Sequence, residues 1–293
     1  MQILHHVDPE RCNGDGICAD VCPEDVLDIV DGRAVTSADR SGACISCGQC
    51  VAVCPRAAIS MPALPDDMFP ELGGGTLAYE DLYAFLARRR SVRRFRDTPV
   101  SRGTVERILD AAATAPMGMP PHSTEVLVFQ DPDERAVLLD EVVREYDAML
   151  KGYSTPVGRA MIRLAAGTEQ YRTLREHIVD IARRANAQYR RDRTDRYMYH
   201  APVFLLFHAD RHAMSYVQNA HLVCHHAMLA AHSLGLGSTI IGLVPPVVDR
   251  SKRLRERYGI PDQNKVITSL ILGYPRFRYR KPIRRALADV RWK

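Results

Sequence analysis

The stretch Cys44-Ile45-Ser46-Cys47-Gly48-Gln49-Cys50-Val51-Ala52-Val53-Cys54-Pro55 decides how the first part of the chain folds. Cysteines recur here at three-residue steps, and a last cysteine follows four positions later with a proline behind it. A run of this kind wraps an iron–sulfur cluster, because its first three thiolates bind one cluster and the last reaches a second one. The run therefore predicts a partner run elsewhere in the chain.

The partner run lies 32 residues earlier and reads Cys12-Asn13-Gly14-Asp15-Gly16-Ile17-Cys18-Ala19-Asp20-Val21-Cys22-Pro23. It agrees with the first run position by position, except that Asp15 stands where the second cysteine would be. Two such runs form an internal repeat. We expect one cluster to be held by Cys22, Cys44, Cys47 and Cys50, and the other by Cys12, Asp15, Cys18 and Cys54.

The paired runs resemble those of the two-cluster bacterial ferredoxins, and the resemblance covers residues 1–62. Zinc binding is one alternative, but zinc sites use paired C-x-x-C arms with a longer spacer. Disulfides are another, and they would require a secreted protein. The spacing favours iron–sulfur clusters over both.

Asp15 leaves two alternatives open for its cluster. A carboxylate that binds iron would give a complete [4Fe-4S] cluster with one labile corner, whereas loss of that corner would leave [3Fe-4S]. A solvent-facing Asp15 without a ligand role is the plainest interpretation. Because an oxygen ligand holds iron less firmly than a thiolate, we expect this cluster to be the more sensitive to oxygen and chelators. Metal analysis and EPR would test that expectation.

Length and composition limit the remaining possibilities. The 293 residues suffice for one small and one medium domain. The sequence contains no apolar run long enough for a transmembrane helix and no signal-peptide pattern at its start, so we expect a cytoplasmic protein without a membrane partner. The net charge is +5, and most of the 40 basic residues are arginine. No nucleic-acid-binding motif accompanies this charge, so we expect no nucleic-acid partner.

Three segments follow from the residue pattern: an iron–sulfur domain over residues 1–62, a Pro/Gly linker over 63–78, and a larger domain over 79–293. The linker contains Pro65, Pro70 and the triplet Gly73-Gly74-Gly75, which interrupt any periodicity. In the small domain, 26–29 and 32–35 are expected to be strands joined by a tight turn. The clusters are expected to hold this domain together, because it can bury little apolar surface.

The larger domain is expected to mix helices and strands. The pattern predicts helices over 79–90, 105–112, 215–234 and 247–258, mostly helical structure over 134–199, and strands over 125–130, 203–208, 238–241 and 266–272. Such an alternation makes an α/β or α+β domain. No G-x-G-x-x-G follows a strand and no Walker A sequence occurs, so a Rossmann half and a P-loop are both unsupported.

Two basic runs could bind a flavin phosphate. A flavin is the natural neighbour of iron–sulfur clusters, because it converts single-electron transfer into two-electron chemistry. The run Arg88-Arg89-Arg90-Ser91-Val92-Arg93-Arg94-Phe95 offers guanidinium groups and a hydroxyl at a helix end, and Arg280-Lys281-Pro282-Ile283-Arg284-Arg285 offers a second cationic group. Taken alone, a basic run of this kind is more often a solvent-exposed surface than a binding site.

Four ordered pieces resemble the nitroreductase family of FMN-dependent oxidoreductases across residues 79–293. They are Arg89–Phe95, Ala115-Pro116-Met117-Gly118, Leu234–Ser238 with Ile241-Gly242-Leu243, and Leu272-Gly273-Tyr274-Pro275. The resemblance implies an α+β fold and a homodimer with FMN at the subunit interface. The whole chain then resembles a fusion of a ferredoxin with a nitroreductase.

The resemblance also implies roles for individual residues. The phosphate and ribityl chain would be held by Arg89, Arg90, Ser91 and Arg93, with Arg285 closing on the phosphate together with Arg284 or Lys281. Pro116, Met117 and Gly118 would line the flavin of the other subunit. Gly242 and Leu243 would offer backbone N–H groups near N5 and O4. No protein acid or base is assigned, because FMN itself carries the chemistry.

The sequence departs from the family at 120–124, where Pro-Pro-His-Ser-Thr replaces an Asn-x-Gln-Pro-Trp motif and so removes a usual polar contact to the flavin. Residues 147–199 are longer than in compact members and could be a helical lid, a docking surface for the head, or a structural insertion. Candidates for the substrate pocket are His122, Tyr146, Tyr153, Tyr197 and Tyr199. A metal role for His221, His225, His226 and His232 is disfavoured, and Cys224 is expected to be a small buried residue.

We therefore expect an oxidoreductase that passes electrons from two iron–sulfur clusters to FMN for reduction of a nitroaromatic, quinone, activated alkene or similar acceptor. The expected donor is a low-potential carrier protein or NAD(P)H. Two alternatives stay open: an NAD(P)H-dependent FMN reductase with an accessory head, and a non-catalytic redox sensor or electron-transfer module.

Overall fold

The structure is a computed structural model, and it describes residues 4–71, 73–120 and 123–293. The chain separates into two compact units, the first running to Leu77 and the second holding almost all of the chain from Ala78 onward. Each unit is described by itself below. Among the described residues, no helix is both long and apolar enough to cross a membrane.

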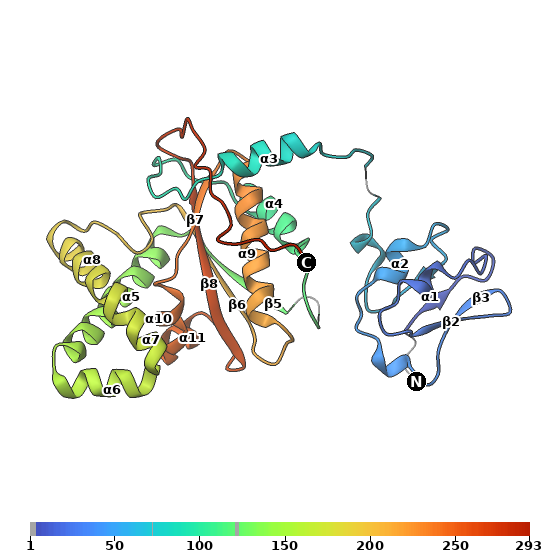
Figure 1. Ribbon diagram of the computed structural model, residues 1–293, viewed down its shortest axis with the longest axis horizontal. Helices are drawn as coiled ribbons and strands as arrows, with labels where there is room; N and C mark the ends of the chain where they lie inside the picture. The colour runs from blue at the N-terminus through green and yellow to red at the C-terminus, as the bar shows by residue number, and fades with distance from the viewer. Residues whose placement is uncertain (1–3, 72, 121–122) are drawn as a thin grey trace. The chain divides into compact units, whose positions relative to one another are not determined.

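The first unit, called the head, is built from short elements (Figure 1). They are β1 (His6–Val7), α1 (Ile17–Asp20), β2 (Leu27–Val30), β3 (Arg33–Thr36), η1 (Ser41–Ala43), α2 (Gln49–Val53), β4 (Ile59–Ser60) and η2 (Asp66–Met68). Strand β1 pairs antiparallel with β4, and β2 pairs antiparallel with β3. The predicted tight turn between β2 and β3 is present, with Asp31 and Gly32 both at positive φ.

The sequence repeat is also a repeat of backbone conformation. Gly16 and Gly48, which are 32 positions apart, both adopt a left-handed conformation as N-caps of α1 and α2. The final cysteine of each run accepts an equivalent hydrogen bond. The N–H of Val26 donates to Cys22 Sγ, and the N–H of Ala58 donates to Cys54 Sγ, each at 3.3 Å. The two halves of the head therefore present their thiols in the same local geometry.

A small apolar core holds the head together and extends past its expected end. Its buried members are Cys18, Leu27, Ala34, Cys50, Ile59, Met61 and Leu64. Phe69 packs partly buried against this core. The linker is expected over residues 63–78, but its first part, up to Phe69, belongs to the core of the head. Sequence patterning missed this because a single leucine and a single phenylalanine between prolines carry no periodic signal.

The second unit contains a four-stranded sheet with helices on both faces (Figure 1). Its strands are β5 (Thr124–Phe129), β6 (Val203–Asp210), β7 (Gly237–Ile240) and β8 (Asn264–Gly273). Its helices are α3 (Tyr79–Arg88), α4 (Arg102–Ala113), α5 (Pro132–Tyr153), α6 (Pro156–Ala166), α7 (Thr168–Thr173), the π-helical turn η3 (Leu174–Ile178), α8 (Val179–Asp192), α9 (Tyr216–Ser233), α10 (Pro245–Arg250) and α11 (Lys252–Arg257).

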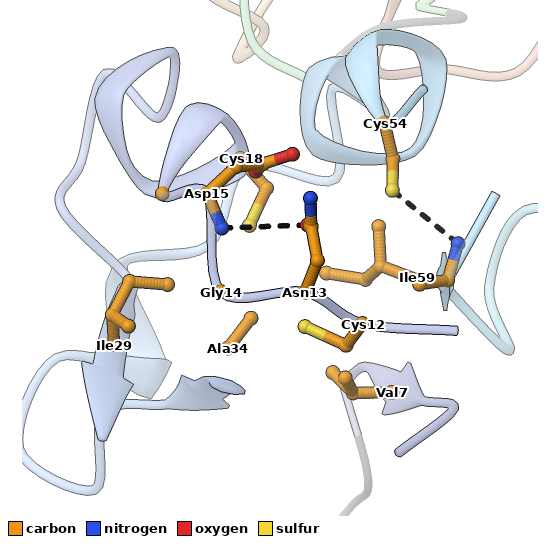
Figure 2. A pocket seen from close by; sticks show the side chains of 12 residues that line it. Val7, Cys12, Asn13, Gly14, Asp15, Cys18, Ile29, Ala34, Cys54 and Ile59 are labelled. Carbon is orange, nitrogen blue, oxygen red and sulfur yellow. Dashed lines mark hydrogen bonds between the residues drawn. The ribbon is translucent and has the colours of Figure 1, made fainter. Parts of the chain in front are cut away.

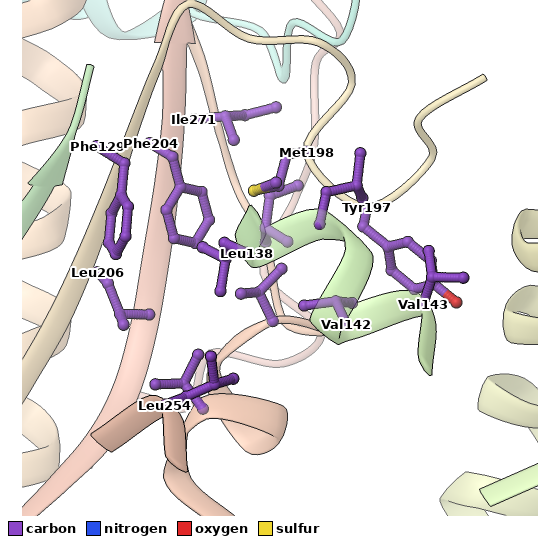
Figure 3. Packing of buried hydrophobic residues seen from close by; sticks show 14 of the residues in the cluster. Phe129, Leu138, Val142, Val143, Tyr197, Met198, Phe204, Leu206, Leu254 and Ile271 are labelled. Atoms are coloured by element: carbon purple, nitrogen blue, oxygen red, sulfur yellow. The ribbon is translucent and has the colours of Figure 1, made fainter. Parts of the chain in front are cut away.

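The sheet order is β5-β6-β8-β7, and every neighbouring pair is antiparallel. Alternation along β6 divides its side chains between two cores: Phe204 and Leu206 face one, and Val203, Leu205 and Phe207 face the other. The first core also takes residues from α5, α8, α10 and α11, as Figure 3 shows in part, while the second takes residues from α4 and α9. An antiparallel sheet between two helical layers confirms the α+β expectation.

One predicted helix divides into two. The pattern predicts a single helix over 247–258, whereas α10 ends at Arg250 and α11 begins at Lys252. Ser251 leaves the helical conformation, and its Oγ accepts a hydrogen bond from the N–H of Leu254. The serine thus acts as an N-cap for α11, which apolar periodicity alone does not register.

His208 makes the stability of the second unit dependent on pH. Its side chain is buried, its Nδ1 accepts a hydrogen bond from Asn264 Nδ2 at 2.8 Å, and burial lowers its pKa. Because the unfolded chain then binds more protons than the folded one, stability falls as the pH drops below about 6.5. We expect urea unfolding followed by circular dichroism to show a smaller loss between pH 7.5 and 5.5 for His208→Gln than for the wild type. Equal losses would contradict this assignment.

Candidate functional site

The first candidate cluster cavity lies between the loop 12–18 and the start of β4. Its lining includes Cys12, Asp15, Cys18 and Cys54, the four ligands expected for one cluster. Figure 2 shows the thiols of Cys12 and Cys18, from the 12–18 loop, and of Cys54, from the end of α2, reaching toward this cavity, with Val7, Ala34 and Ile59 completing its apolar wall. The structure therefore brings a cysteine of the second run to the loop of the first run.

The second candidate cavity has the reciprocal arrangement. Cys22, from the first run, lies in its lining together with Cys44, Cys47 and Cys50 from the second run. His5 and Met61 contribute to the same wall. All eight expected ligands are thus distributed four and four, in the crossed order expected from the sequence.

The spacing of these donors suits a cluster better than a single ion. Four thiolates around one zinc lie about 3.8 Å from each other, since each Zn–S bond is about 2.3 Å. Within the described residues, no group of three or more His, Cys, Asp or Glu side chains is close enough to hold one metal ion. An iron–sulfur cluster places its own iron and sulfide atoms between the thiolates, so its ligands lie farther apart than those of a single ion.

Asp15 is held by its own loop. Its side chain is exposed, and its Oδ1 accepts a hydrogen bond from the N–H of Ile17 at 3.2 Å. The donor set of this cavity is therefore three thiols and one carboxylate, and both expected cluster types fit it.

In the second unit, backbone pairing brings the two basic runs together. Ser91 forms an isolated parallel bridge with Ser238, and the N–H of Val92 donates to Ser238 O at 3.1 Å. A few residues on, the N–H of Arg96 donates to Tyr274 O and that of Arg276 donates to Arg94 O, both at 2.9 Å. Two arginine-rich segments some 180 residues apart in sequence therefore run side by side at the ends of β7 and β8.

These segments enclose a hollow of about 880 Å³, called here the first arginine hollow. It is lined by Tyr83, Leu86, Ala87, Arg89, Arg90, Ser91, Arg93, Tyr279, Pro282, Ile283, Arg284 and Arg285. Six of the twelve residues expected to contact FMN are among them. Lys281 is not in this lining, whereas Arg284 and Arg285 are.

The electrostatics of the first arginine hollow favour an anion. Burial lowers the pKa of Arg89, and the neighbouring Arg90 and Arg285 lower it further. Arg93 places its guanidinium 5.8 Å from the ring centre of Tyr199, a cation–π contact that the sequence did not predict. Several guanidinium groups held this close repel each other, and a phosphate between them would remove that repulsion.

The other residues expected to contact FMN lie outside this lining. Pro116 is exposed and Met117 and Gly118 are half-buried, while Gly242 is exposed and Leu243 is half-buried against the first core. The resemblance assigns Pro116, Met117 and Gly118 to the flavin of a second subunit. A single chain would not bring that group to its own hollow.

Two tyrosines proposed for the substrate pocket belong to the core instead. Tyr146 and Tyr197 are buried, and their rings stack with centres 5.2 Å apart. The Tyr146 hydroxyl donates to Leu243 O at 2.8 Å, and the Tyr197 hydroxyl donates to Asn186 Oδ1 at 2.6 Å. Burial raises the pKa of Tyr146 to about 12, so it stays protonated and fixes the position of Leu243.

The remaining candidates have separate surroundings. Tyr153 contacts Tyr171, and Tyr199 lies against Arg93, while His122 lies outside the described residues. His226 Nδ1 lies 3.4 Å from Thr114 Oγ1, and His232 Nε2 donates to Phe85 O at 3.2 Å. Cys224 is buried, as expected, and its burial raises the pKa of its thiol to about 12.

Asp195 fixes the loop that carries Tyr199. Its buried carboxylate accepts three backbone hydrogen bonds of 2.8 Å, from Tyr197, Met198 and His200. Tyr199 and His200 both adopt left-handed conformations, which these bonds hold in place.

We expect Asp195→Ala to lower the free energy of unfolding by roughly 3 kcal/mol, because buried N–H groups lose their acceptor. The variant should also bind flavin more weakly, since Tyr199 no longer supports Arg93. Denaturant unfolding and flavin titration would measure both effects. Asp192→Ala is the matched control, because that carboxylate is exposed in the same segment. Similar losses in both variants would refute the role of Asp195.

Together, the structure has paired cysteine loops in one unit and an arginine-lined hollow beside an antiparallel sheet in the other, features that suit a redox protein. Comparison with protein-family models agrees. Residues 86–274 match the nitroreductase family, and residues 5–55 match the 4Fe-4S dicluster domain. The chain belongs to the nitroreductase family and carries an iron–sulfur head, and the expectation of an oxidoreductase of this family is confirmed.

Individual relatives agree with both assignments. A protein of Methanothermobacter thermautotrophicus, provisionally named an NADH dehydrogenase/NAD(P)H nitroreductase, is 24% identical over 207 residues, covering 69% of this chain and 81% of that protein. Ferredoxin-1 of Nitratidesulfovibrio vulgaris is 55% identical over 29 residues, covering 10% of this chain and 47% of the ferredoxin. A nitroreductase with bound FMN from Bacteroides fragilis has a similar fold, with a TM-score of 0.55 at 18% identity, covering 73% and 99% of the two chains.

Proposed function

We propose that the protein is an FMN-dependent oxidoreductase whose head delivers electrons through two iron–sulfur clusters for the reduction of a small organic acceptor. The observation that carries this proposal is the crossed distribution of the eight expected ligands over two cavities of the head. A loop pair arranged in this way serves electron transfer. The acceptor class follows the expectation from sequence: nitroaromatics, quinones, activated alkenes and halogenated phenols.

The first arginine hollow fits FMN by its chemistry. Arg89, Arg90, Arg284 and Arg285 would hold the phosphate, and Ser91 with Arg93 would hold the ribityl chain. Leu86, Pro282 and Ile283 give the same hollow an apolar part that suits a flat ring. The solved nitroreductase from Bacteroides fragilis binds FMN, which supports the same cofactor here.

Bound FMN would supply the conversion between single-electron and two-electron transfer that iron–sulfur clusters lack. The chain's own part is to bind and orient. Tyr146 holds Leu243 through its carbonyl, and so fixes the backbone that is proposed to offer N–H groups to the flavin ring. Tyr199, on the loop that Asp195 fixes, lies against the guanidinium of Arg93.

A homodimer is part of the proposal. The residues Pro116, Met117 and Gly118 would complete the flavin site of the second subunit, as the family resemblance implies. Helix α9 supports this because Val217, Gln218, His221, Leu222 and His225 are exposed along it, while residues such as Ala220, Cys224 and Ala227 are buried. Size-exclusion chromatography with light scattering would measure the oligomeric state.

For the head, we propose [4Fe-4S] at Cys22, Cys44, Cys47 and Cys50, and [4Fe-4S] or [3Fe-4S] at Cys12, Asp15, Cys18 and Cys54. The donor to these clusters would be a low-potential carrier protein. Direct reduction by NAD(P)H is the second candidate, and the name of the Methanothermobacter thermautotrophicus relative favours it. A non-catalytic redox sensor is the remaining alternative.

Anaerobic stopped-flow spectroscopy of the purified protein tests the proposal. Cluster bleaching would be followed near about 400 nm and flavin bleaching near about 450 nm, with a reduced carrier protein and NADH added separately. We expect the carrier to bleach the clusters first and the flavin afterwards, with many turnovers of a nitroaromatic or quinone acceptor. Flavin bleaching by NADH ahead of the clusters would reverse the proposed direction, and single turnover would favour the sensor.

The double variant Cys47→Ser/Cys50→Ser is the matched control. It removes two expected ligands of one cluster and leaves the second unit unchanged. We expect it to lose turnover driven by the carrier while keeping its bound flavin. Unchanged turnover would show that electrons bypass the head.

A further inference from the structure

A second hollow lies on the other side of the Arg88–Arg94 segment. It has a volume of about 910 Å³ and is called here the second arginine hollow. Of its lining residues, the family resemblance assigns only Arg89 and Arg90 to a ligand, which is FMN. Its guanidinium groups come from Arg88, Arg89, Arg90, Arg276, Arg278 and Arg280, and no carboxylate occurs among its described lining residues.

The arginines of this hollow lack the acidic partners that several helix arginines of the second unit have. On the helices, Arg102 pairs with Glu106 and Arg183 pairs with Asp180, and similar pairs recur along α5, α8 and α11. In the described part of the chain, no ion pair involves any of the hollow's arginines. Six guanidinium groups around one concave surface without a counter-charge favour an anionic ligand.

Ser238 gives an independent sign of a ligand. Its side chain is 2% exposed, and its Oγ has no hydrogen-bond partner among the described residues, although it lines this hollow. A buried hydroxyl without a partner destabilises the folded state. A ligand oxygen that displaces the atoms covering Oγ would give it one.

Aromatic rings complete the lining. Phe277 and Tyr279 are both more than half exposed, and the guanidinium of Arg276 lies 5.8 Å from the ring centre of Phe277. Exposed rings beside guanidinium groups are suited to a ligand that joins a phosphate to a flat base.

The two hollows share Arg89, Arg90 and Tyr279 but are otherwise lined by different residues. Ser91, Arg93, Arg284 and Arg285 belong only to the first hollow. Arg276, Phe277, Arg278 and Ser238 belong only to the second. Substitutions can therefore address one hollow at a time.

We propose that the second arginine hollow is a separate binding site for a phosphate-bearing nucleotide, which binds beside the FMN phosphate and at the same time as FMN. The guanidinium groups hold its phosphates, Ser238 Oγ donates to a phosphate oxygen, and the exposed rings stack on its base. The proposal rests on the assignment of FMN to the first hollow.

Isothermal titration calorimetry of the full-length, FMN-loaded protein tests it, with ADP and inorganic pyrophosphate as probes at low salt. We expect saturable ADP binding that is tighter than pyrophosphate binding and weakens as salt is added. Arg278→Ala should weaken ADP binding about tenfold and leave FMN affinity unchanged, whereas Arg285→Ala should do the reverse. Phe277→Ala should remove the advantage of ADP over pyrophosphate.

Ser238→Ala separates ligand binding from folding. Because the hydroxyl has no partner in the protein, its removal should leave the thermal midpoint unchanged or raise it. ADP binding should nevertheless weaken by about threefold to tenfold.

Three results would overturn the proposal. One is the absence of ADP binding to the FMN-loaded protein up to millimolar concentration, and another is unchanged ADP affinity in Ser238→Ala. The last is a loss of FMN affinity in Arg278→Ala as large as in Arg285→Ala, which would make both hollows one FMN site. Failure of the proposed function would look different, because the purified protein would then hold no FMN at all.

Discussion

A Gly14→Ala variant is expected to lose the cluster assigned to Cys12, Asp15, Cys18 and Cys54. Gly14 has a φ of +68°, a backbone conformation that residues other than glycine rarely adopt. A Cβ on this residue would lie 2.3 Å from Gly32 O and within 2.9 Å of two further backbone atoms. Because the obstruction is backbone, the loop 12–18 can accommodate the methyl group only by moving away from the β2–β3 turn.

That movement would separate the ligands of one cavity. Cys12 and Cys18 flank Gly14 on the same loop, whereas Cys54 comes from the end of α2. We expect the purified variant to contain about half the iron of the wild type, and its EPR spectrum to keep only the signal of the cluster assigned to Cys22, Cys44, Cys47 and Cys50.

Gly42→Ala is the matched control in the head. Gly42 has no heavy atom within 4 Å of an added Cβ and needs no positive φ. This variant should keep the full iron content. Full iron in Gly14→Ala as well would refute the close fit of the loop, and loss of both clusters would mean that the head unfolds as one unit.

The second large effect is expected from Gly237→Ala at the start of β7. A Cβ there would lie 2.6–2.8 Å from three atoms of the Val92 side chain. Val92 is buried, and its N–H donates to Ser238 O, so it has little room to retreat. The methyl group should therefore push the Arg89–Arg93 segment away from the sheet.

We expect Gly237→Ala to lower the free energy of unfolding by about 1–3 kcal/mol, as overpacking does. FMN affinity should fall by at least about tenfold, because the displaced arginines no longer meet Arg284 and Arg285. Fluorescence titration with FMN and denaturant unfolding would measure the two effects.

Two companions sharpen this test. Gly103→Ala adds the same methyl group in α4 with nothing within 4 Å, so it should change neither property for the worse. The double variant Val92→Ala/Gly237→Ala removes the obstruction and should recover most of the FMN affinity. Failure of this rescue would show that Gly237 acts by some route other than Val92.

The head shows how far local sequence can reach. The ligands Cys12, Asp15 and Cys18 lie within one short loop, so their spacing alone predicted that they share a cavity. The crossing of Cys22 and Cys54 followed from the same repeat. Leu64 and Phe69 were missed, because their burial depends on the neighbouring Met61 and on Gly48 in the second cysteine run rather than on any periodic pattern.

The second unit shows where sequence reasoning stops. Tyr146 and Tyr197 could be named as polar aromatic residues, but only packing against each other and against Asn186 shows that they are structural. The contact of Tyr199 with Arg93 had no signal in the sequence at all, since it depends on a loop that Asp195 fixes.

The sequence by itself determined the two cluster loops, the mixed helix and sheet order, and the presence of two basic runs. These are local properties, set by ligand spacing, side-chain periodicity and composition over a few residues. Only the tertiary structure decided that Arg88–Arg94 and Arg276–Arg285 meet. It also decided that they enclose two hollows, the second of which Ser238 of β7 helps to line. That outcome depends on the antiparallel pairing of β7 with β8, which brings together segments far apart in the chain.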